Sequence, residues 1–233
     1  MENYKIKEII QEFIIGNYKY SVKKSLMQKD KKNRYIYNEI SLQHELGMYL
    51  RKNLKDEYIV QFERNIKDFG YKKGEFCKSE IDIVLLGKEK DDNILIELKY
   101  HTLDETRYHD TTADCVKDIR FVYDVVNDYE KNIEDTENYI IFKKGFCLTI
   151  VEDKKFYTKS NREKFFNYYC FRDINNKFDG KISYSGKDKN KTVKDTETLI
   201  DEGYLPIREN HQNEKNTGWI PIYDEAKYYL IEI

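Results

Sequence analysis

Two short apolar segments of the chain each carry charged residues at positions where a buried strand would normally have apolar side chains. The segment EIDIVLLG (80–87) alternates so that Asp82 lies on the face opposite its neighbouring isoleucines. The segment ILIELKY (94–100) places Glu97 and Lys99 together on one face in the same way. Charged side chains are costly to bury unless they are paired or bind a metal. The two segments therefore predict a site built from charged groups.

The turn KEKDDN (88–93) is short enough to fold the two segments against each other, which brings Asp82 near Glu97. Two carboxylates at one point suit Mg²⁺, which prefers a few hard oxygen ligands and keeps several waters. Such a metal polarises a phosphate and lowers the pKa of a bound water. Lys99 would orient or deprotonate that water, or stabilise the charge of the transition state. The chemistry indicated is metal-assisted phosphate hydrolysis.

Helical and strand periodicities surround these segments in an order that suits a single sheet. Helices are expected over 4–15, 17–28 and 36–54. Strands are expected over 57–64, 80–87, 94–100, 139–151 and 228–233, with 139–151 read as one strand or a pair. Gly16 is expected to end the first helix. Thr111, with Asp114 three residues on, resembles a capping box that opens another helix. The predicted class is α/β with a mixed central sheet.

The order of these elements and the charged residues together resemble the PD-(D/E)xK, restriction endonuclease-like nuclease superfamily. The family core is an αβββαβ arrangement, and residues 36–151 follow that order. Asp82 matches the family Asp, although Ile81 stands where the family name has Pro. Glu97 and Lys99 match the ExK pair. The resemblance implies a divalent-metal-dependent endonuclease that hydrolyses nucleic-acid phosphodiester bonds in restriction, defence or repair, with DNA as the expected substrate.

The resemblance also implies roles for individual residues. Asp82 and Glu97 would ligate Mg²⁺ or Mn²⁺ together with the backbone carbonyl of Leu98. Lys99 would serve the nucleophilic water. Glu45, in SLQHELGMYL, matches an acidic residue common on the family's first core helix. It would ligate a second metal or position the first.

Substrate contacts are less strongly indicated by the sequence. Lys117 and Arg120 lie on the helix after the lysine strand, where they would hold phosphate or simply form a solvated face. Arg107 lies in the loop TLDETRYHD beside the expected site. The Lys-rich stretch 139–195, with interleaved aromatic residues, is a candidate nucleic-acid surface. For any one of its residues, however, an ordinary role in a solvated face or in the aromatic core is the favoured interpretation.

Composition bounds the remaining possibilities. The chain has 233 residues with 41 basic and 43 acidic side chains, and its net charge of −2 excludes a protein that coats nucleic acid by charge alone. We expect a single nuclease-like domain with its core at 36–151, an N-terminal helical extension over 1–34 and a C-terminal extension over 152–233. No apolar run approaches the roughly 18 residues that a membrane helix needs. The four cysteines form no CxxC pair, which favours reduced thiols in the cytoplasm.

The sequence also leaves a rival from another functional class. A nuclease fold that has lost its chemistry would serve as a nucleic-acid-binding or assembly subunit. Intact Asp, Glu and Lys argue against that alternative. Whether the chain acts as a homodimer or with a partner subunit is left open.

Overall fold

The structure is a computed structural model of the chain. It describes residues 4–21, 34–72, 76–89, 91–102, 108–127, 133, 139–154 and 218–233. Three of the sequence predictions lie wholly or partly outside these residues: Arg107, residues 22–28 of the helix expected over 17–28, and the part of the Lys-rich stretch beyond residue 154.

A six-stranded mixed sheet forms the centre of the fold. Its strands are β1 (Ile59–Asn65), β2 (Glu80–Leu86), β3 (Asn93–His101), β4 (Phe142–Val151), β5 (Ile220–Tyr223) and β6 (Ala226–Glu232). They lie in the order β1-β2-β3-β4-β6-β5, and all neighbours pair antiparallel except β3 and β4, which are parallel. The predicted α/β class and mixed sheet are confirmed. Residues 139–151 supply one strand, β4, and not a pair.

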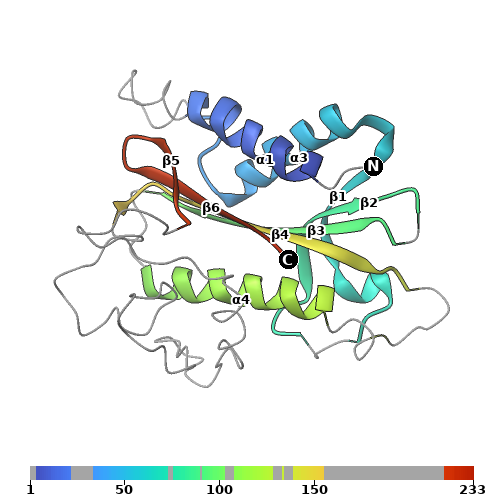
Figure 1. Cartoon of the computed structure of the whole chain (residues 1–233). Coiled ribbons are helices and arrows are strands. Elements are labelled where there is room, and N and C mark those ends of the chain that lie inside the picture. Colours follow the sequence, from blue (N-terminus) through green and yellow to red (C-terminus); the bar gives the residue numbers. More distant parts are fainter. Residues whose placement is uncertain are drawn as a thin grey trace.

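Helices cover both faces of the sheet (Figure 1). On one face lie α1 (Tyr4–Phe13) and α3 (Glu39–Leu54), and on the other lies α4 (Tyr108–Asn127), which connects β3 to β4. A helical crossover is the usual way to join parallel neighbours. The order α3-β1-β2-β3-α4-β4 is the one that the sequence predicts.

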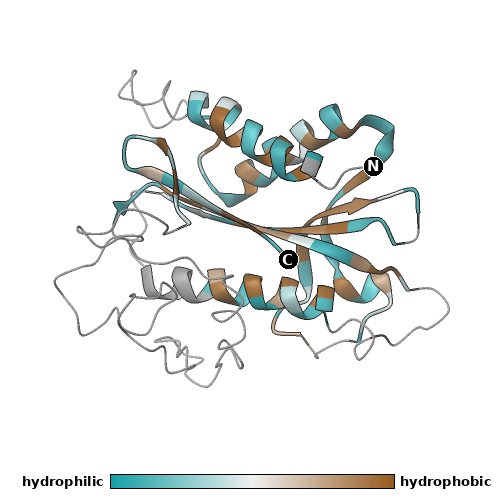
Figure 2. Ribbon diagram, in the orientation of Figure 1, coloured by the Kyte–Doolittle hydropathy of each residue, from teal (hydrophilic) through white to brown (hydrophobic). Residues whose placement is uncertain are grey.

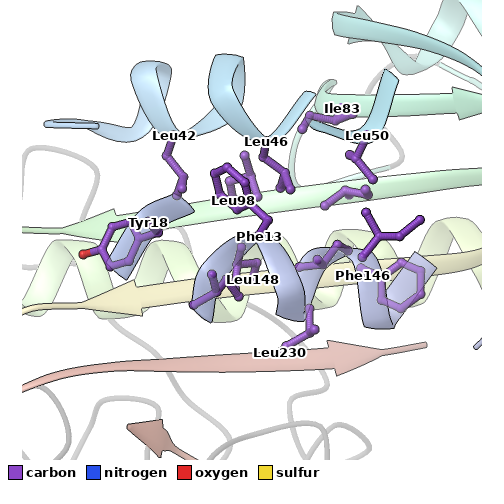
Figure 3. Packing of buried hydrophobic residues seen from close by; sticks show 14 of the residues in the cluster. Phe13, Tyr18, Leu42, Leu46, Leu50, Ile83, Leu98, Phe146, Leu148 and Leu230 are labelled. Atoms are coloured by element: carbon purple, nitrogen blue, oxygen red, sulfur yellow. The ribbon is translucent and has the colours of Figure 1, made fainter. Parts of the chain in front are cut away.

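Two apolar cores result, one on each side of the sheet, because alternate residues of the central strands point to opposite faces. In Figure 3, Phe13 of α1 and Leu46 of α3 pack against Leu98 of β3 and Leu148 of β4. The opposite core joins Leu95 to residues of α4 such as Val122. The hydrophobic bands along the strands and the inner sides of the helices are visible in Figure 2.

The chain ends expected as extensions take part in this same packing. Ile10 of α1 is fully buried against the sheet, and β6 pairs with β4 along six residues. Pro221 lies in the outermost strand β5, a position where a missing N–H is tolerated. Within the described residues, no helix is long and apolar enough to cross a membrane.

Two predicted helix boundaries are wrong. Gly16 does not end the first helix, because a π-helical turn, η1 (Ile14–Tyr18), carries the chain through it and helix continues to Ser21. A helical glycine costs only about 1 kcal/mol relative to alanine, and burial of Ile14 and Tyr18 outweighs that cost. Thr111 is not a cap, since α4 already begins at Tyr108. The polar first turn of α4 carries no apolar period that would reveal its start.

Candidate active site

The site begins where β2 and β3 separate. Their ladder pairs Leu85 with Ile94 and continues to Ile83 with Ile96. Beyond that point the Asp82 side chain links the two strands, because its Oδ2 accepts a hydrogen bond of 2.7 Å from the Leu98 backbone N–H. The strands therefore stay joined by a side chain, and Asp82 is fixed beside β3.

A buried glutamine of α3 holds the same position from the other side. Gln43 Nε2 donates to the Asp82 carbonyl oxygen and to Glu63 Oε1, both at 2.6 Å. Gln43 is only 7% exposed, and these partners satisfy an amide that would otherwise be costly to bury. Asp82 is thus anchored through both its main chain and its side chain.

Lys78 lies at the centre of the charged groups. Its Nζ donates to Asp82 Oδ1 at 3.2 Å and to Glu97 Oε2, and lies 3.5 Å from Asp118 Oδ1. The three carboxylates come from β2, β3 and α4 respectively. One ammonium group therefore joins both strands of the site to the helix behind them.

Lys99 forms a second, adjoining set of ion pairs. Its Nζ lies 3.1 Å from Glu39 Oε1 and 3.1 Å from Asp118 Oδ2. Glu39 is the first residue of α3, which is capped by Asn38, and its other oxygen accepts the Tyr100 N–H at 3.3 Å. Asp118 thereby links the two lysines. We call Glu39, Lys78, Asp82, Glu97, Lys99 and Asp118 the acid cluster.

The acid cluster has more negative than positive charge. With all groups ionised, four carboxylates face two ammonium groups, a formal charge of −2. Burial, followed by the nearby Asp82 carboxylate, raises the pKa of Glu97 well above its usual range. Its Oε1 has no hydrogen-bond partner within the described part of the chain. The cluster thus retains an unused buried acceptor and unneutralised charge.

Both lysines of the acid cluster are held in their charged form. Burial lowers the pKa of Lys99, but the carboxylates of Asp118 and Glu39 outweigh it and hold that pKa above its ordinary value. Burial likewise opposes the charge of Lys78, and Asp118, Glu97 and Asp82 together raise its pKa. Each lysine is therefore an ammonium group and not a proton acceptor in this arrangement.

A cleft of about 340 Å³ opens at the Lys99 end of the cluster. Glu39 and Lys99 line it together with Tyr37 and Asp114. Tyr37 is 59% exposed, so an aromatic ring stands at the edge of the cleft. A larger cavity of about 540 Å³ lies around Tyr58 and Lys143, remote from the acid cluster, and carries none of its residues.

The structure brings three of the four predicted catalytic residues into one network: Asp82, Glu97 and Lys99. Glu45 lies elsewhere on α3, where its Oε1 is 3.5 Å from His44 Nδ1. Glu39, six residues earlier in the chain, is the α3 acid that reaches the cluster. Leu98 contributes its N–H to Asp82, and no described contact uses its carbonyl oxygen at the site.

The predicted substrate residues of α4 lie outside the acid cluster. Arg120 forms an ion pair of 2.6 Å with Asp124, one turn along the helix. The Lys117 carbonyl oxygen accepts a hydrogen bond from Cys77 Sγ at 3.3 Å. The Cys77 contact places the backbone of Lys117 near the segment that carries Lys78, whereas the ion pair of Arg120 with Asp124 stays within α4.

Sequence reasoning missed Glu39, Lys78 and Asp118. Asp118 had a usable signal, because it falls among Cys115, Val122 and other buried positions of α4. Glu39 offered only a weak signal, because an acidic residue is common in the first turn of a helix. Lys78 had none, since it lies in the irregular segment before β2.

The acid cluster has chemistry suited to a hard cation, although its geometry is that of ion pairs. Among the described residues, no three His, Cys, Asp or Glu side chains are arranged to hold a metal ion directly. The cation that Asp82 and Glu97 share is the Lys78 ammonium. Comparisons with protein-family models, with curated proteins and with solved structures found no match to this chain.

Proposed function

We propose that this chain is a Mg²⁺- or Mn²⁺-dependent endonuclease with a restriction endonuclease-like core, and that its substrate is DNA. One observation carries the proposal: Asp82 and Glu97, from adjacent strands, direct carboxylate oxygens at one shared cation. Carboxylates that already converge on a positive charge fit a small divalent ion, and the unpartnered Glu97 Oε1 offers a further oxygen. The order α3-β1-β2-β3-α4-β4 supports the same assignment.

Asp82 and Glu97 would hold the metal, with the Leu98 carbonyl as a third candidate ligand. A bound divalent ion would polarise the phosphate and acidify a water. Lys99 lines the cleft, where its ammonium group would orient the water and stabilise negative charge on a phosphate oxygen. Because its pKa is raised, we assign Lys99 this electrostatic role and not that of a general base.

Glu39 and Asp118 would act as positioning residues. Each places one carboxylate oxygen 3.1 Å from Lys99 Nζ, and the two acids come from α3 and α4, which cover opposite faces of the sheet. A flexible lysine held between two fixed carboxylates keeps its ammonium group in one place.

Cys77, Cys115 and Cys147 are free thiols, which supports the proposed cytoplasmic location.

One observation favours a second candidate. Because Lys78 already lies between oxygens of Asp82 and Glu97, the fold would also suit a non-catalytic nucleic-acid-binding protein in which the ammonium group permanently replaces the metal. The two candidates differ in a single property, the ability of a divalent ion to enter the acid cluster.

Cleavage of labelled plasmid and single-stranded DNA, with Mg²⁺, Mn²⁺, Ca²⁺ or EDTA, tests the proposal. We expect cutting with Mg²⁺ or Mn²⁺, and Ca²⁺-dependent DNA binding without cutting. Lys99→Ala is expected to lose cleavage but keep most of its DNA affinity, since the lysine acts in the transition state. Lys144→Ala, which removes a lysine paired with Glu232, is the matched control. Binding that ignores the metal, with no cleavage, would select the non-catalytic candidate.

A further inference from the structure

Lys78 is the side chain in the acid cluster whose role the proposed function leaves unexplained. Its ammonium group contacts carboxylates from three different elements, through Asp82, Glu97 and Asp118. The side chain is only 16% exposed. Its three N–H donors each face a carboxylate, so one positive charge meets three negative ones.

The partners of Lys78 are the same atoms that a divalent ion would need. Glu97 Oε2 is bonded to Lys78, while Glu97 Oε1 has no hydrogen-bond partner within the described residues. Asp82 Oδ1 is bonded to Lys78, while Asp82 Oδ2 is engaged by the Leu98 N–H. An ammonium group and a metal therefore compete for Asp82 Oδ1 and Glu97 Oε2.

We propose that the Lys78 ammonium occupies the divalent-cation position of the metal-free protein and withdraws when the metal enters. This inference rests on the proposed function, since it concerns the same metal site. Exchange of one positive charge for two reduces the excess charge of the acid cluster from −2 to −1, so the exchange is electrostatically favourable.

Local structure permits this movement without a change of fold. Lys78 precedes β2, and its four-carbon stem can swing while Asp82 stays anchored by Leu98 and Gln43. Without metal, the ammonium keeps the carboxylates from repelling one another. Lys78 is therefore a stand-in cation that stabilises the carboxylates of the cluster and competes with metal binding.

Calcium titration of Lys78→Met and Lys99→Met by calorimetry tests the competition. The two variants are matched, since each removes one ammonium group of similar burial, 16% or 15% exposed, from the same cluster. Lys99 pairs with Glu39 and Asp118, and not with the proposed ligands. We expect Lys78→Met to bind Ca²⁺ at least about tenfold more tightly than the wild type, with a clearly smaller gain for Lys99→Met. Equal gains, or none for Lys78→Met, would overturn the inference.

A second measurement uses the wild-type protein and does not depend on a variant that folds. Acetylation of lysine amines, read by peptide mass spectrometry with and without Ca²⁺, reports the accessibility of Lys78. We expect its labelling to rise over the same Ca²⁺ range that saturates the site. Lys144, paired with Glu232, should not change. Saturation by Ca²⁺ with unchanged labelling of Lys78 would contradict the inference.

These outcomes separate the inference from the function on which it rests. If wild-type protein binds Ca²⁺ and cleaves DNA, but Lys78 neither competes nor becomes accessible, only the inference fails. If neither wild type nor Lys78→Met binds a divalent ion, the proposed nuclease function fails with it.

Discussion

Two buried charged networks lie close together in this protein, and they differ in charge balance and in how fully their carboxylate oxygens are bonded. The acid cluster combines four carboxylates with two lysines and leaves Glu97 Oε1 unbonded within the described residues. The other, which we call the Glu152 network, combines Glu152 with Arg34, Tyr18 and Tyr100. One network has surplus charge, and the other has one acid for one base.

The Glu152 network uses both oxygens of its carboxylate. Arg34 binds it through two nitrogens at 2.6 and 3.0 Å, while the hydroxyls of Tyr18 and Tyr100 donate to Oε1 at 2.8 and 2.7 Å. Burial first, and then the charge of Glu152, raises the pKa of Tyr100, which keeps its hydroxyl a donor. This charge-balanced network ties η1 and Arg34 to the sheet and leaves no carboxylate oxygen unused, although the buried Arg34 Nε has no hydrogen-bond partner among the described residues.

This difference between the two networks indicates how a structural ion pair can be distinguished from a binding site. Both networks are buried and contain acids within strands or at strand ends, so burial and residue type do not distinguish them. The two networks are distinguished by their charge balance and by the presence or absence of unused acceptor atoms. On this argument, changes in the Glu152 network should affect stability, and changes in the acid cluster should affect metal binding and catalysis.

The largest expected effect is on stability, in Glu152→Gln. The substitution leaves the Arg34 guanidinium buried without a counter-charge, a change that typically costs about 3–5 kcal/mol. The free energy of unfolding in urea should fall by that amount, while the rate of DNA cleavage per folded molecule stays unchanged. A loss below about 1 kcal/mol would show that the pair does not hold the N-terminal helices to the sheet.

Glu97→Gln should have the opposite effects, a loss of catalytic activity without a loss of stability. Loss of this proposed metal ligand is expected to reduce kcat for DNA cleavage by at least about 10²-fold, as for removal of one preorganised electrostatic group. Unfolding free energy should stay the same or rise, because a buried carboxylate with a raised pKa is removed. Asp91→Asn, an exposed carboxylate paired with Lys143, is the control for charge alone. Full activity in Glu97→Gln would remove this residue from the mechanism.

Two buried groups should respond to pH with opposite signs. Burial, with a smaller effect of Lys99, lowers the pKa of His101 to about 3, and its ring Nε2 lies 3.5 Å from Cys115 Sγ. Below the unfolded pKa of about 6.5 the unfolded chain binds the extra proton. His101 therefore removes up to about 1.4 kcal/mol of stability per pH unit as pH falls toward 3.

Glu97 has a raised pKa, so its destabilising effect is present at neutral pH and is relieved as pH falls. Urea unfolding from pH 7 to pH 4 measures both effects against His101→Gln and Glu97→Gln. The advantage of His101→Gln over wild type should grow at low pH, and that of Glu97→Gln should shrink. Parallel curves for all three proteins would refute the assigned signs.

Tyr18→Phe should give the smallest effect, a loss of about 1 kcal/mol in unfolding free energy. The Glu152 carboxylate keeps Arg34 and the Tyr100 hydroxyl, so only one of its donors disappears. Thermal denaturation with a double variant that includes Tyr100→Phe would show whether the hydroxyls act independently. A loss as large as that of Glu152→Gln would mean that the π-helical turn itself depends on this bond.

Sequence patterns predicted the acids within strands and failed for those on helices, for a physical reason. A charge in an apolar strand is exceptional, so Asp82 and Glu97 were recognisable. A charge on an amphipathic helix is ordinary, so nothing local distinguished Glu39 from Glu45. Only the direction of α3 across the sheet decides which of the two reaches Lys99.

Residues outside regular elements were harder still. Lys78 reaches the site because the segment before β2 brings its ammonium group to Glu97 of β3 and Asp118 of α4, a tertiary property that no sequence period encodes. The Glu152 network escaped notice for the same reason, since Arg34 and Glu152 are 118 residues apart. The sheet order beyond β4 likewise depends on long-range pairing of β6.

The central claim is that surplus carboxylate charge marks a divalent-metal site, and direct counting of bound Mn²⁺ tests it most simply. Electron paramagnetic resonance of free Mn²⁺ would be recorded during titration of wild type, Glu97→Gln and Tyr18→Phe. The account predicts one strong site per chain in wild type and Tyr18→Phe, with affinity at least about tenfold weaker in Glu97→Gln. Equal Mn²⁺ binding by wild type and Glu97→Gln, or no binding by wild type, would contradict it.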